Sequence, residues 1–389
     1  MTTVEVVTGE RLVGRLVVGD GLRPVVEFTY DRGWLSAGYP IDPELPLSAA
    51  PFVRGDSLFG AFADAGPDSW GRGLLARSHP DRLLSEADYL LMVDDTARQG
   101  ALRFRDAEGR WCSDRSPVPY VDDLDVLRRA AHAAEEERGE PPRVIVAAGG
   151  GTGGARPKAV LRDDGALWIA KFGSRHDTIE TEEAEHAVAV LGRRAGLTMS
   201  ETRLVHDLAE PVLLSRRFDR TGTERHAFLS ARTLLRAVVD PGRETFDYLE
   251  LADVLPELSA RPTADLRELW RRVAFGCLVQ NTDDHMRNHA FVRVGDGWRL
   301  SPAFDVNTDP GLGLTSATSV DGEAGPGKLE ALVRSADYFR LTEPAARTLL
   351  AELAEAVASS LDGVLASFAS TRTAERLREI ISARVGEAR

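Results

Sequence analysis

The chain has 389 residues, enough for two or three domains with a sizeable core, and its hydrophobic (43%) and charged (28%) fractions are those of an ordinary globular protein. The formal net charge of −13 argues against DNA binding by phosphate neutralisation alone, so a role on DNA would need a basic partner. Neither Cys112 nor Cys277 has a CxxC neighbour, no apolar run approaches about 18 residues, and the first residues lack a signal-peptide pattern. These features argue against a disulfide scaffold, a cysteine metal site and a membrane-spanning protein, and we expect a cytoplasmic protein.

The pattern of residues 1–139 predicts a β-rich N-terminal subdomain. Short runs rich in β-branched and aromatic residues alternate there with glycine and proline turns. The expected strands cover residues 4–7, 11–18 and 25–30, and the expected helices cover residues 69–77, 85–93 and 122–138. The sequence Gly-Glu-Pro-Pro at 139–142 stops the last helix and marks an expected domain boundary.

The pattern changes in residues 140–225, which predict a small α/β lobe with a glycine-rich turn near its start. The expected strands of this lobe cover residues 158–161, 167–172, 202–205 and 211–215, and its expected helix covers residues 179–195. Residues 226–389 predict a mostly helical third segment. Its expected helices cover residues 264–280, 341–361 and 373–385.

The spacing of polar residues in the third segment points to a catalytic loop. Asp283 precedes Asn288 by five residues, which is the spacing between the base and the metal-binding amide of a protein-kinase catalytic loop. Residues 289–294 and 298–300 are expected to form a β-hairpin around a Gly-Asp-Gly turn, and Asp305 follows it. A base, an amide and a carboxylate are thus expected at the two ends of one hairpin, as phosphoryl transfer from Mg-ATP requires.

A glycine-rich run in the second segment is a weak signal alone. Gly149, Gly151 and Gly154 satisfy G-x-G-x-x-G, but a flexible turn also satisfies it. Lys171 strengthens the functional interpretation, because a lysine on a strand after such a loop holds the ATP phosphates in kinases. Glu185, on the next helix, could pair with it or lie on a solvated face. Spacing does not distinguish Glu185 from its neighbours Glu180, Glu182 and Glu183.

Residues 322–329 contain the G-x-x-x-x-G-K part of a phosphate-binding P-loop. Leu329 stands where a serine or threonine should bind Mg²⁺, and no strand is expected directly before the segment. We therefore expect an ordinary loop here.

Three further candidates have plain alternatives. His285 and His289 are four residues apart, as zinc ligands on a helix can be, but no third ligand is evident, so we expect His285 to brace the catalytic loop. Asp284 could be a second functional carboxylate, or it could face solvent or cap a turn. The segment 215–220 could lie at a site or form an ordinary charged turn.

Several motifs, in this order and spacing, resemble one family over nearly the whole chain. The sequence is similar to HipA-type kinases, the toxins of bacterial HipBA toxin–antitoxin modules. The resemblance rests on residues 67–72 (PDSWGR), 99–104 (QGALRF), 153–158 (GGARPK), 169–172 (IAKF), 217–220 (RFDR), 281–289 (NTDDHMRNH) and 301–305 (SPAFD).

The resemblance implies an α+β, protein-kinase-like bilobal fold, with a β-rich N-terminal subdomain, a nucleotide-binding lobe and a helical C-terminal lobe. It implies Ser/Thr kinase activity with ATP and Mg²⁺. Members of the family phosphorylate aminoacyl-tRNA synthetases, which arrests growth, and are restrained by a small helix-turn-helix antitoxin. Such a chain would meet DNA only through its antitoxin, which agrees with the negative net charge.

The resemblance also assigns roles to individual residues. Asp283 would be the catalytic base, and Asn288 and Asp305 would bind Mg²⁺. Lys171 would hold the ATP phosphates with Glu185 as its partner. The remaining residues expected at the nucleotide are Gly151, Thr152, Gly153, Gly154, Lys158, Arg217, Phe218, Asp219 and His285.

One position departs from the family. Many members carry a regulatory serine in the glycine-rich loop, whose autophosphorylation switches the kinase off. The matching position here is Gly151, and the only hydroxyl of the loop belongs to Thr152. Thr152 could substitute for the serine, or a separate short partner protein could supply control.

Two other functions remain open at this point. The same loop could serve a small-molecule kinase, acting on an antibiotic or a metabolite. The chain could also be a nucleotide-binding corepressor without kinase activity, which works only by binding an antitoxin at its operator.

Overall fold

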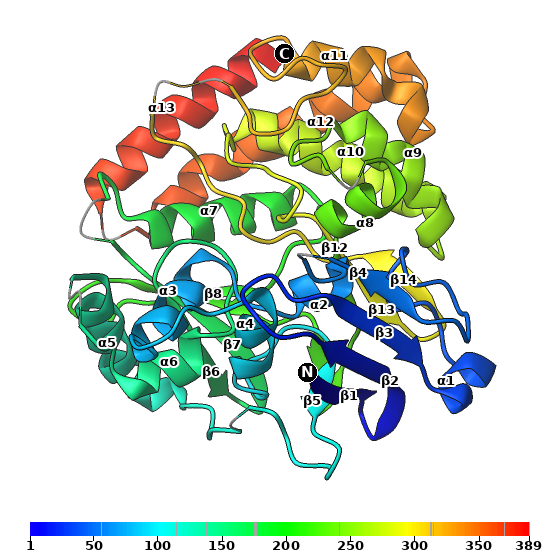
Figure 1. The fold of residues 1–389 in the computed structure, drawn as a ribbon. Coiled ribbons are helices and arrows are strands. Elements are labelled where there is room, and N and C mark those ends of the chain that lie inside the picture. Colours follow the sequence, from blue (N-terminus) through cyan, green and yellow to red (C-terminus); the bar gives the residue numbers. More distant parts are fainter. Residues whose placement is uncertain are drawn as a thin grey trace. The chain divides into compact units, whose positions relative to one another are not determined.

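The computed structural model describes residues 1–55, 57–113, 115–136, 139–174, 177–240, 242–311, 313, 315–368 and 370–388. The chain forms two compact units (Figure 1). The first comprises Met1–Ser174 and Asp219–Leu229, and the second comprises Arg175–Phe218 and Ser230–Arg389. The division into three domains at residues 139 and 225 stays a prediction.

The first unit begins with an antiparallel five-stranded sheet in the order β4-β3-β2-β1-β5 (Figure 1, blue to cyan). Its strands are β1 (Thr2–Thr8), β2 (Arg11–Val18), β3 (Val26–Tyr30), β4 (Phe52–Arg54) and β5 (Arg103–Arg105). Phe62 packs edge-on against Phe28 and Phe104, with ring centroids 5.4 and 6.1 Å apart. The three predicted strands are confirmed, and the two short edge strands were not predicted.

Helices and hairpins complete the first unit. They are α1 (Arg32–Ala37), α2 (Gly60–Asp64), α3 (Ser69–Ser78), α4 (Glu86–Met92), η1 (Val121–Asp123), α5 (Leu124–Glu136), α6 (Arg143–Gly149), β6 (Lys158–Asp163), β7 (Ala166–Phe172), β10 (Arg220–Thr221) and β11 (Glu224–Arg225). The fully buried Arg98 donates to the carbonyls of Ala65, Leu90 and Val93, which fixes the end of α4 and the segment after it.

The second unit is mostly helical. Its elements are α7 (Thr181–Arg194), β8 (Thr202–Val205), β9 (Val212–Arg216), α8 (Ala231–Val238), α9 (Tyr248–Leu258), α10 (Pro262–Leu278), β13 (Ala290–Val294), β14 (Gly297–Leu300), α11 (Lys328–Arg334), η2 (Ala336–Phe339), α12 (Glu343–Leu365) and α13 (Thr371–Ala388). The short strand β12 (Phe228–Ser230) lies where the chain passes from the first unit to the second. The helices α12 and α13 pack against each other and against α7 and α10 (Figure 1).

A buried carboxylate joins α10 to the β13–β14 hairpin. Asp265, in the first turn of α10, accepts hydrogen bonds from the Arg299 guanidinium at 2.7 Å, the Ser259 hydroxyl at 2.6 Å and the Leu300 amide at 3.1 Å. Because α10 leads into residues 281–288 and the hairpin follows them, both ends of the predicted catalytic loop start from one rigid assembly.

Two local predictions differ from the structure. The hairpin is present, but β14 already begins at Gly297, so a two-residue turn joins the strands and Gly295 adopts a positive φ of 59°. The P-loop-like segment was predicted to be a loop, yet α11 begins inside it at Lys328, and the Lys328 side chain is buried. The segment therefore ends in a packed helix.

Within the described residues, no helix combines the length and the apolar character needed to cross a lipid bilayer.

Replacing Asp265 by alanine is expected to lower the free energy of unfolding by roughly 2–3 kcal/mol, because several buried donors lose their acceptor. Asp296→Ala, at the exposed tip of the same hairpin, is the matched control and should change stability by less than about 0.5 kcal/mol. Urea unfolding of both variants measures this difference, and equal midpoints would contradict it.

Candidate active site

The glycine-rich loop of residues 149–154 follows α6 and is anchored on α3 within the first unit. The Trp70 backbone amide donates to the Gly154 carbonyl at 3.0 Å, and the Trp70 indole donates to the Lys158 carbonyl, also at 3.0 Å. The Asp68 carboxylate accepts from the Gly154 amide at 3.4 Å. The segment Pro67–Gly71, recognised only as a family motif in the sequence, thus holds the end of the loop.

The loop packs closely at some of its glycines and not at others. A Cβ at Gly151 would lie 2.7 Å from Val93 Cγ1, closer than real Cβ contacts. Gly154 has a positive φ of 76°, and a Cβ there would lie 2.7 Å from Lys158 Nζ. At Gly153 an added Cβ would meet nothing within 4 Å. A serine at position 151 therefore requires the loop or its neighbours to shift.

Thr152 is turned into the protein in this conformation of the loop. Its side chain is only 3% exposed, and its hydroxyl donates to the Gly149 carbonyl at 2.7 Å. Modification of this hydroxyl would require the loop to leave its packed position. Whether Thr152 substitutes for the regulatory serine of the family stays a prediction.

Two lysines lie side by side next to the loop. Lys158 and Lys171 are directly paired across the antiparallel β6–β7 hairpin, and their exposed fractions are only 6% and 9%. Like charges that face each other across strands destabilise a sheet, so such a pair favours binding of an anion. The structure therefore brings together the loop, Lys158 and Lys171, as the sequence predicted.

The catalytic-loop residues come together in the second unit. The Asn288 side-chain amide donates to the Asp283 carbonyl at 3.2 Å, and the His285 backbone amide donates to the same carbonyl at 3.0 Å. The Asn288 backbone amide in turn donates to the His285 carbonyl at 2.8 Å. His285 thus lies inside the turn that carries Asp283 and Asn288, which agrees with a bracing role.

The segment after the hairpin returns to this loop. The Thr282 hydroxyl donates to Asp309 at 2.6 Å, and the Asp309 amide donates to the Gln280 carbonyl at 2.9 Å. Asp305 has a left-handed backbone with a φ of 56°, a strained state that is uncommon outside glycine and concentrates at functional sites. The fold thus holds Asp305 in a costly conformation near the catalytic loop.

Carboxylates crowd this part of the second unit. Partial burial raises the pKa of the Asp283 carboxyl, His285 opposes that rise, and repulsion from Asp305, Asp284 and Asp309 adds to it. Carboxylate and amide oxygens are the ligands that Mg²⁺ prefers, so the crowded carboxylates and Asn288 fit a magnesium ion. Among the described residues, no three His, Cys, Asp or Glu side chains form a metal cluster.

One interpretation of the sequence placed Asp284 facing solvent, and the structure shows instead that it is buried. Its carboxylate is buried and accepts hydrogen bonds from the Tyr248 hydroxyl and, at 3.0 Å, from His289 Nε2. Burial opposes its ionisation, but His289 and the nearby Lys328 outweigh that cost and lower the pKa of Asp284 to about 2. The sequence did not show that Tyr248 and Lys328 lie beside Asp284, because both are far from it along the chain.

The other predicted nucleotide-site residues fall in both units. Glu185 is buried on α7 in the second unit, whereas Lys171 belongs to the first, and their pairing stays a prediction. Arg217 is buried, and the Phe218 ring packs 5.2 Å from Phe304, next to Asp305.

Asp219 lies in the first unit and is engaged by protein groups. It accepts from the Gly100 amide at 2.8 Å and from the Arg220 guanidinium at 2.7 Å. The segment 217–220 is therefore more than an exposed charged turn, while its contact with a nucleotide stays a prediction.

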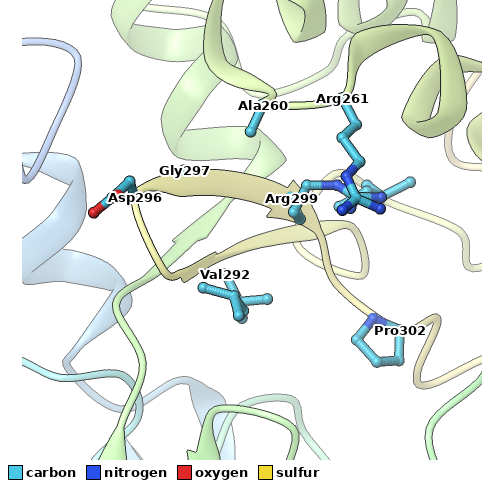
Figure 2. A pocket seen from close by; sticks show the side chains of 9 residues that line it. Ala260, Arg261, Val292, Asp296, Gly297, Arg299 and Pro302 are labelled. Atoms are coloured by element: carbon cyan, nitrogen blue, oxygen red, sulfur yellow. The ribbon is translucent and has the colours of Figure 1, made fainter.

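A groove of about 590 Å³ opens beside the β13–β14 hairpin in the second unit. Figure 2 shows Val292 and Pro302 on the strands of this hairpin and its continuation, with Arg261 and Arg299 also lining the groove. None of the predicted site residues lines it. The groove is thus separate from the side chains of the catalytic loop.

We expect Gly151→Ser to lower the free energy of unfolding by about 1–3 kcal/mol, because the new side chain overpacks the contact with Val93. Gly153→Ser, two residues away in open space, is the control and should be nearly neutral. Urea unfolding without nucleotide tests the pair. A Gly151→Ser variant as stable as the control would show that the loop is not packed as described.

The low pKa of Asp284 predicts a specific pH dependence of stability. A carboxyl whose folded pKa lies near 2 and whose ordinary value is 3.8 stabilises the folded state above pH 3.8, and this contribution is lost as pH falls towards 2. The stability difference between the wild type and Asp284→Asn should therefore shrink by roughly 2 kcal/mol between pH 5 and pH 2. Parallel urea-unfolding curves across this range would contradict the assignment.

Comparisons with known proteins agree with these features. The model of the HipA-like C-terminal domain matches residues 150–361, and the model of the HipA N-terminal domain matches residues 4–104. No curated protein matches the chain.

Two solved structures are similar to it. HipA of Shewanella oneidensis MR-1, solved with HipB and operator DNA, has a TM-score of 0.78 at 17% identity, over 99% of this chain and 96% of that one. The Helicobacter pylori proinflammatory kinase CtkA has a TM-score of 0.48 at 15% identity, over 61% of this chain and 90% of that one.

The first of these likenesses confirms the predicted α+β, HipA-like fold. The C-terminal domain model alone covers more than half of the chain, and the N-terminal model covers most of the remaining motif-bearing segment. The chain therefore belongs to the HipA family.

Proposed function

We propose that this chain is a Ser/Thr protein kinase that uses ATP and Mg²⁺ and acts as the toxin of a toxin–antitoxin module. The observation that carries the proposal is the arrangement in the second unit: Asp283 and Asn288 share one hydrogen-bonded turn, and Asp305 is held nearby in a left-handed conformation. These are the residue types that phosphoryl transfer requires at that spacing. Membership of the HipA family supports it further.

Each residue would act through its own chemistry. Asp283 would accept the proton of the attacking hydroxyl, and its raised pKa makes it a better base than an ordinary aspartate. Asn288 and Asp305 would supply oxygen ligands to the metal, and the amides of the glycine-rich loop would donate to phosphate oxygens. Lys158 and Lys171 would neutralise phosphate charge. When bound, Mg-ATP supplies the phosphoryl group and the positive charge that offsets the carboxylates.

The proposed partner is a small helix-turn-helix antitoxin. Support comes from the fold, which is similar to that of a HipA solved with HipB and operator DNA. The formal net charge of −13 disfavours direct phosphate contacts, so the antitoxin would make the DNA contacts. We further propose a protein of the translation apparatus as substrate, with an aminoacyl-tRNA synthetase as the first candidate.

Replacing Asp283 by asparagine is expected to lower phosphate transfer by about 10²–10⁴-fold, because the amide cannot accept the hydroxyl proton. The purified protein is incubated with labelled ATP, Mg²⁺ and a bacterial lysate, and the intensity of the labelled protein bands measures phosphate transfer. Asp296→Asn, on the exposed hairpin tip, is the control and should label like the wild type.

The result separates the candidate functions. A protein band that depends on Asp283 identifies the substrate for sequencing. Equal labelling by wild type and Asp283→Asn would show that the base is misassigned. Transfer to a small molecule alone would point to a small-molecule kinase, and nucleotide binding without transfer would point to a corepressor.

A further inference from the structure

A buried polar triad lies directly behind the catalytic loop of the second unit. Asp284 Oδ1 accepts from His289 Nε2 at 3.0 Å, Asp284 Oδ2 accepts from the Tyr248 hydroxyl, and that hydroxyl lies 3.2 Å from His289 Nε2. All three side chains are buried. The proposed mechanism uses none of them, and a buried polar network whose hydrogen bonds are made rigidifies the groups attached to it.

The triad spans the proposed catalytic residues along the chain. Asp284 directly follows Asp283, and His289 directly follows Asn288. The bond between Asp284 and His289 therefore closes an interval of the same length as that from the base to the metal-binding amide, one residue further along the chain. Any displacement of the triad moves both ends of the catalytic loop.

The third member of the triad comes from a well-fixed helix start. Tyr248 is the first residue of α9, and Asp247 before it caps the helix through the Leu249 amide at 2.8 Å. Asp247 also accepts from the Ser319 hydroxyl at 2.6 Å and from the Gly322 amide at 3.0 Å. The Tyr248 hydroxyl is therefore a rigid reference point for the loop.

A second helix start holds the loop from the other side. The Ala231 amide donates to the His289 carbonyl at 2.8 Å, and the Arg232 amide donates to the Met286 carbonyl at 3.0 Å. The Ser230 hydroxyl, which accepts from the Thr233 amide, caps this helix, α8. The loop is thus fixed by its backbone on α8 and by the triad on α9.

The negative charge of the triad has a buried counter-charge. Lys328, the first residue of α11, places its Nζ 5.0 Å from the centre of the Tyr248 ring, and its charge favours ionised Asp284. Arg272 and Cys277 of α10 and the neighbouring Asp283 are further titratable groups that interact with Asp284 or Tyr248. The lysine of the P-loop-like segment thus contributes to this cluster.

We propose that Tyr248, Asp284 and His289 are positioning residues, which orient Asp283 and Asn288 for phosphoryl transfer without touching the reacting groups. This inference rests on the proposed kinase function. Phosphoryl transfer depends mainly on positioning, and displacement of a catalytic group by about 1 Å can cost about 100-fold in rate. Loss of one member should therefore lower the transfer rate at saturating ATP by much more than it changes the KM for ATP.

Tyr248→Phe is the sharpest test, because it removes one hydroxyl and keeps the ring. The rate of phosphate transfer into lysate protein at saturating ATP should fall about 10–100-fold, with the KM for ATP within about twofold of wild type. The control is Tyr338→Phe, which removes the same hydroxyl from a tyrosine that is 41% exposed in the same unit and should leave the rate unchanged. Thermal unfolding of each variant verifies that it is folded at the assay temperature.

A second pair of variants tests the triad if Tyr248→Phe does not fold. His289→Gln retains an N–H donor for Asp284 and should keep most of the rate, whereas His289→Leu loses the donor and should be slow. If His289 had only a structural role, the folded His289→Gln and His289→Leu variants would transfer phosphate at the same rate.

The outcomes separate this inference from the function on which it rests. Folded Tyr248→Phe with wild-type rate, or His289→Leu as fast as His289→Gln, would overturn the positioning role while the kinase function stands. Wild-type protein that binds Mg-ATP but transfers no phosphate would overturn the proposed function and the inference together.

Discussion

Repulsion between carboxylates is the constraint on which the second unit depends. Partial burial raises the pKa of Asp283, and repulsion from Asp305, Asp284 and Asp309 adds to that rise. The chain holds them together through hydrogen bonds between residues 280–282 and 307–309, and it tolerates a left-handed backbone at Asp305. Crowded carboxylates and a strained backbone both cost free energy, and a cation bound there would offset the repulsion between the carboxylates.

The first unit also brings like charges together, but these charges are positive. Lys158 and Lys171 are paired across β6–β7 with little exposure, beside a loop whose glycines allow close approach. An anion relieves this repulsion as a cation relieves that of the carboxylates. The proposed ligand, Mg-ATP, carries charges of both signs.

Local sequence patterns predicted the parts of the site that lie close together along the chain. The five-residue interval from Asp283 to Asn288 is closed by hydrogen bonds within one turn, so spacing alone was informative. The strands β1 to β3 and the helix α10 likewise follow from periodicity. The short edge strands β4 and β5 are too brief to show it.

Contacts between distant segments could not be predicted in this way. Asp284 was open to a solvent-facing interpretation because its partner Tyr248 lies 36 residues earlier in the chain. Lys328 resembled part of a phosphate loop, and only tertiary packing places it beside Tyr248. The absence of a serine at Gly151 was visible in the sequence, but its physical basis, the contact with Val93, was not.

The measurement that tests the central claim most directly is calorimetric titration of ATP with and without Mg²⁺, for the wild type, Lys171→Met and Asp305→Asn. The proposed use of Mg-ATP predicts that Mg²⁺ tightens ATP binding to the wild type, that Lys171→Met weakens binding in both conditions, and that Asp305→Asn loses the Mg²⁺ effect. ATP binding that is indifferent to Mg²⁺ in the wild type, or a Mg²⁺ effect that survives in Asp305→Asn, would contradict the account.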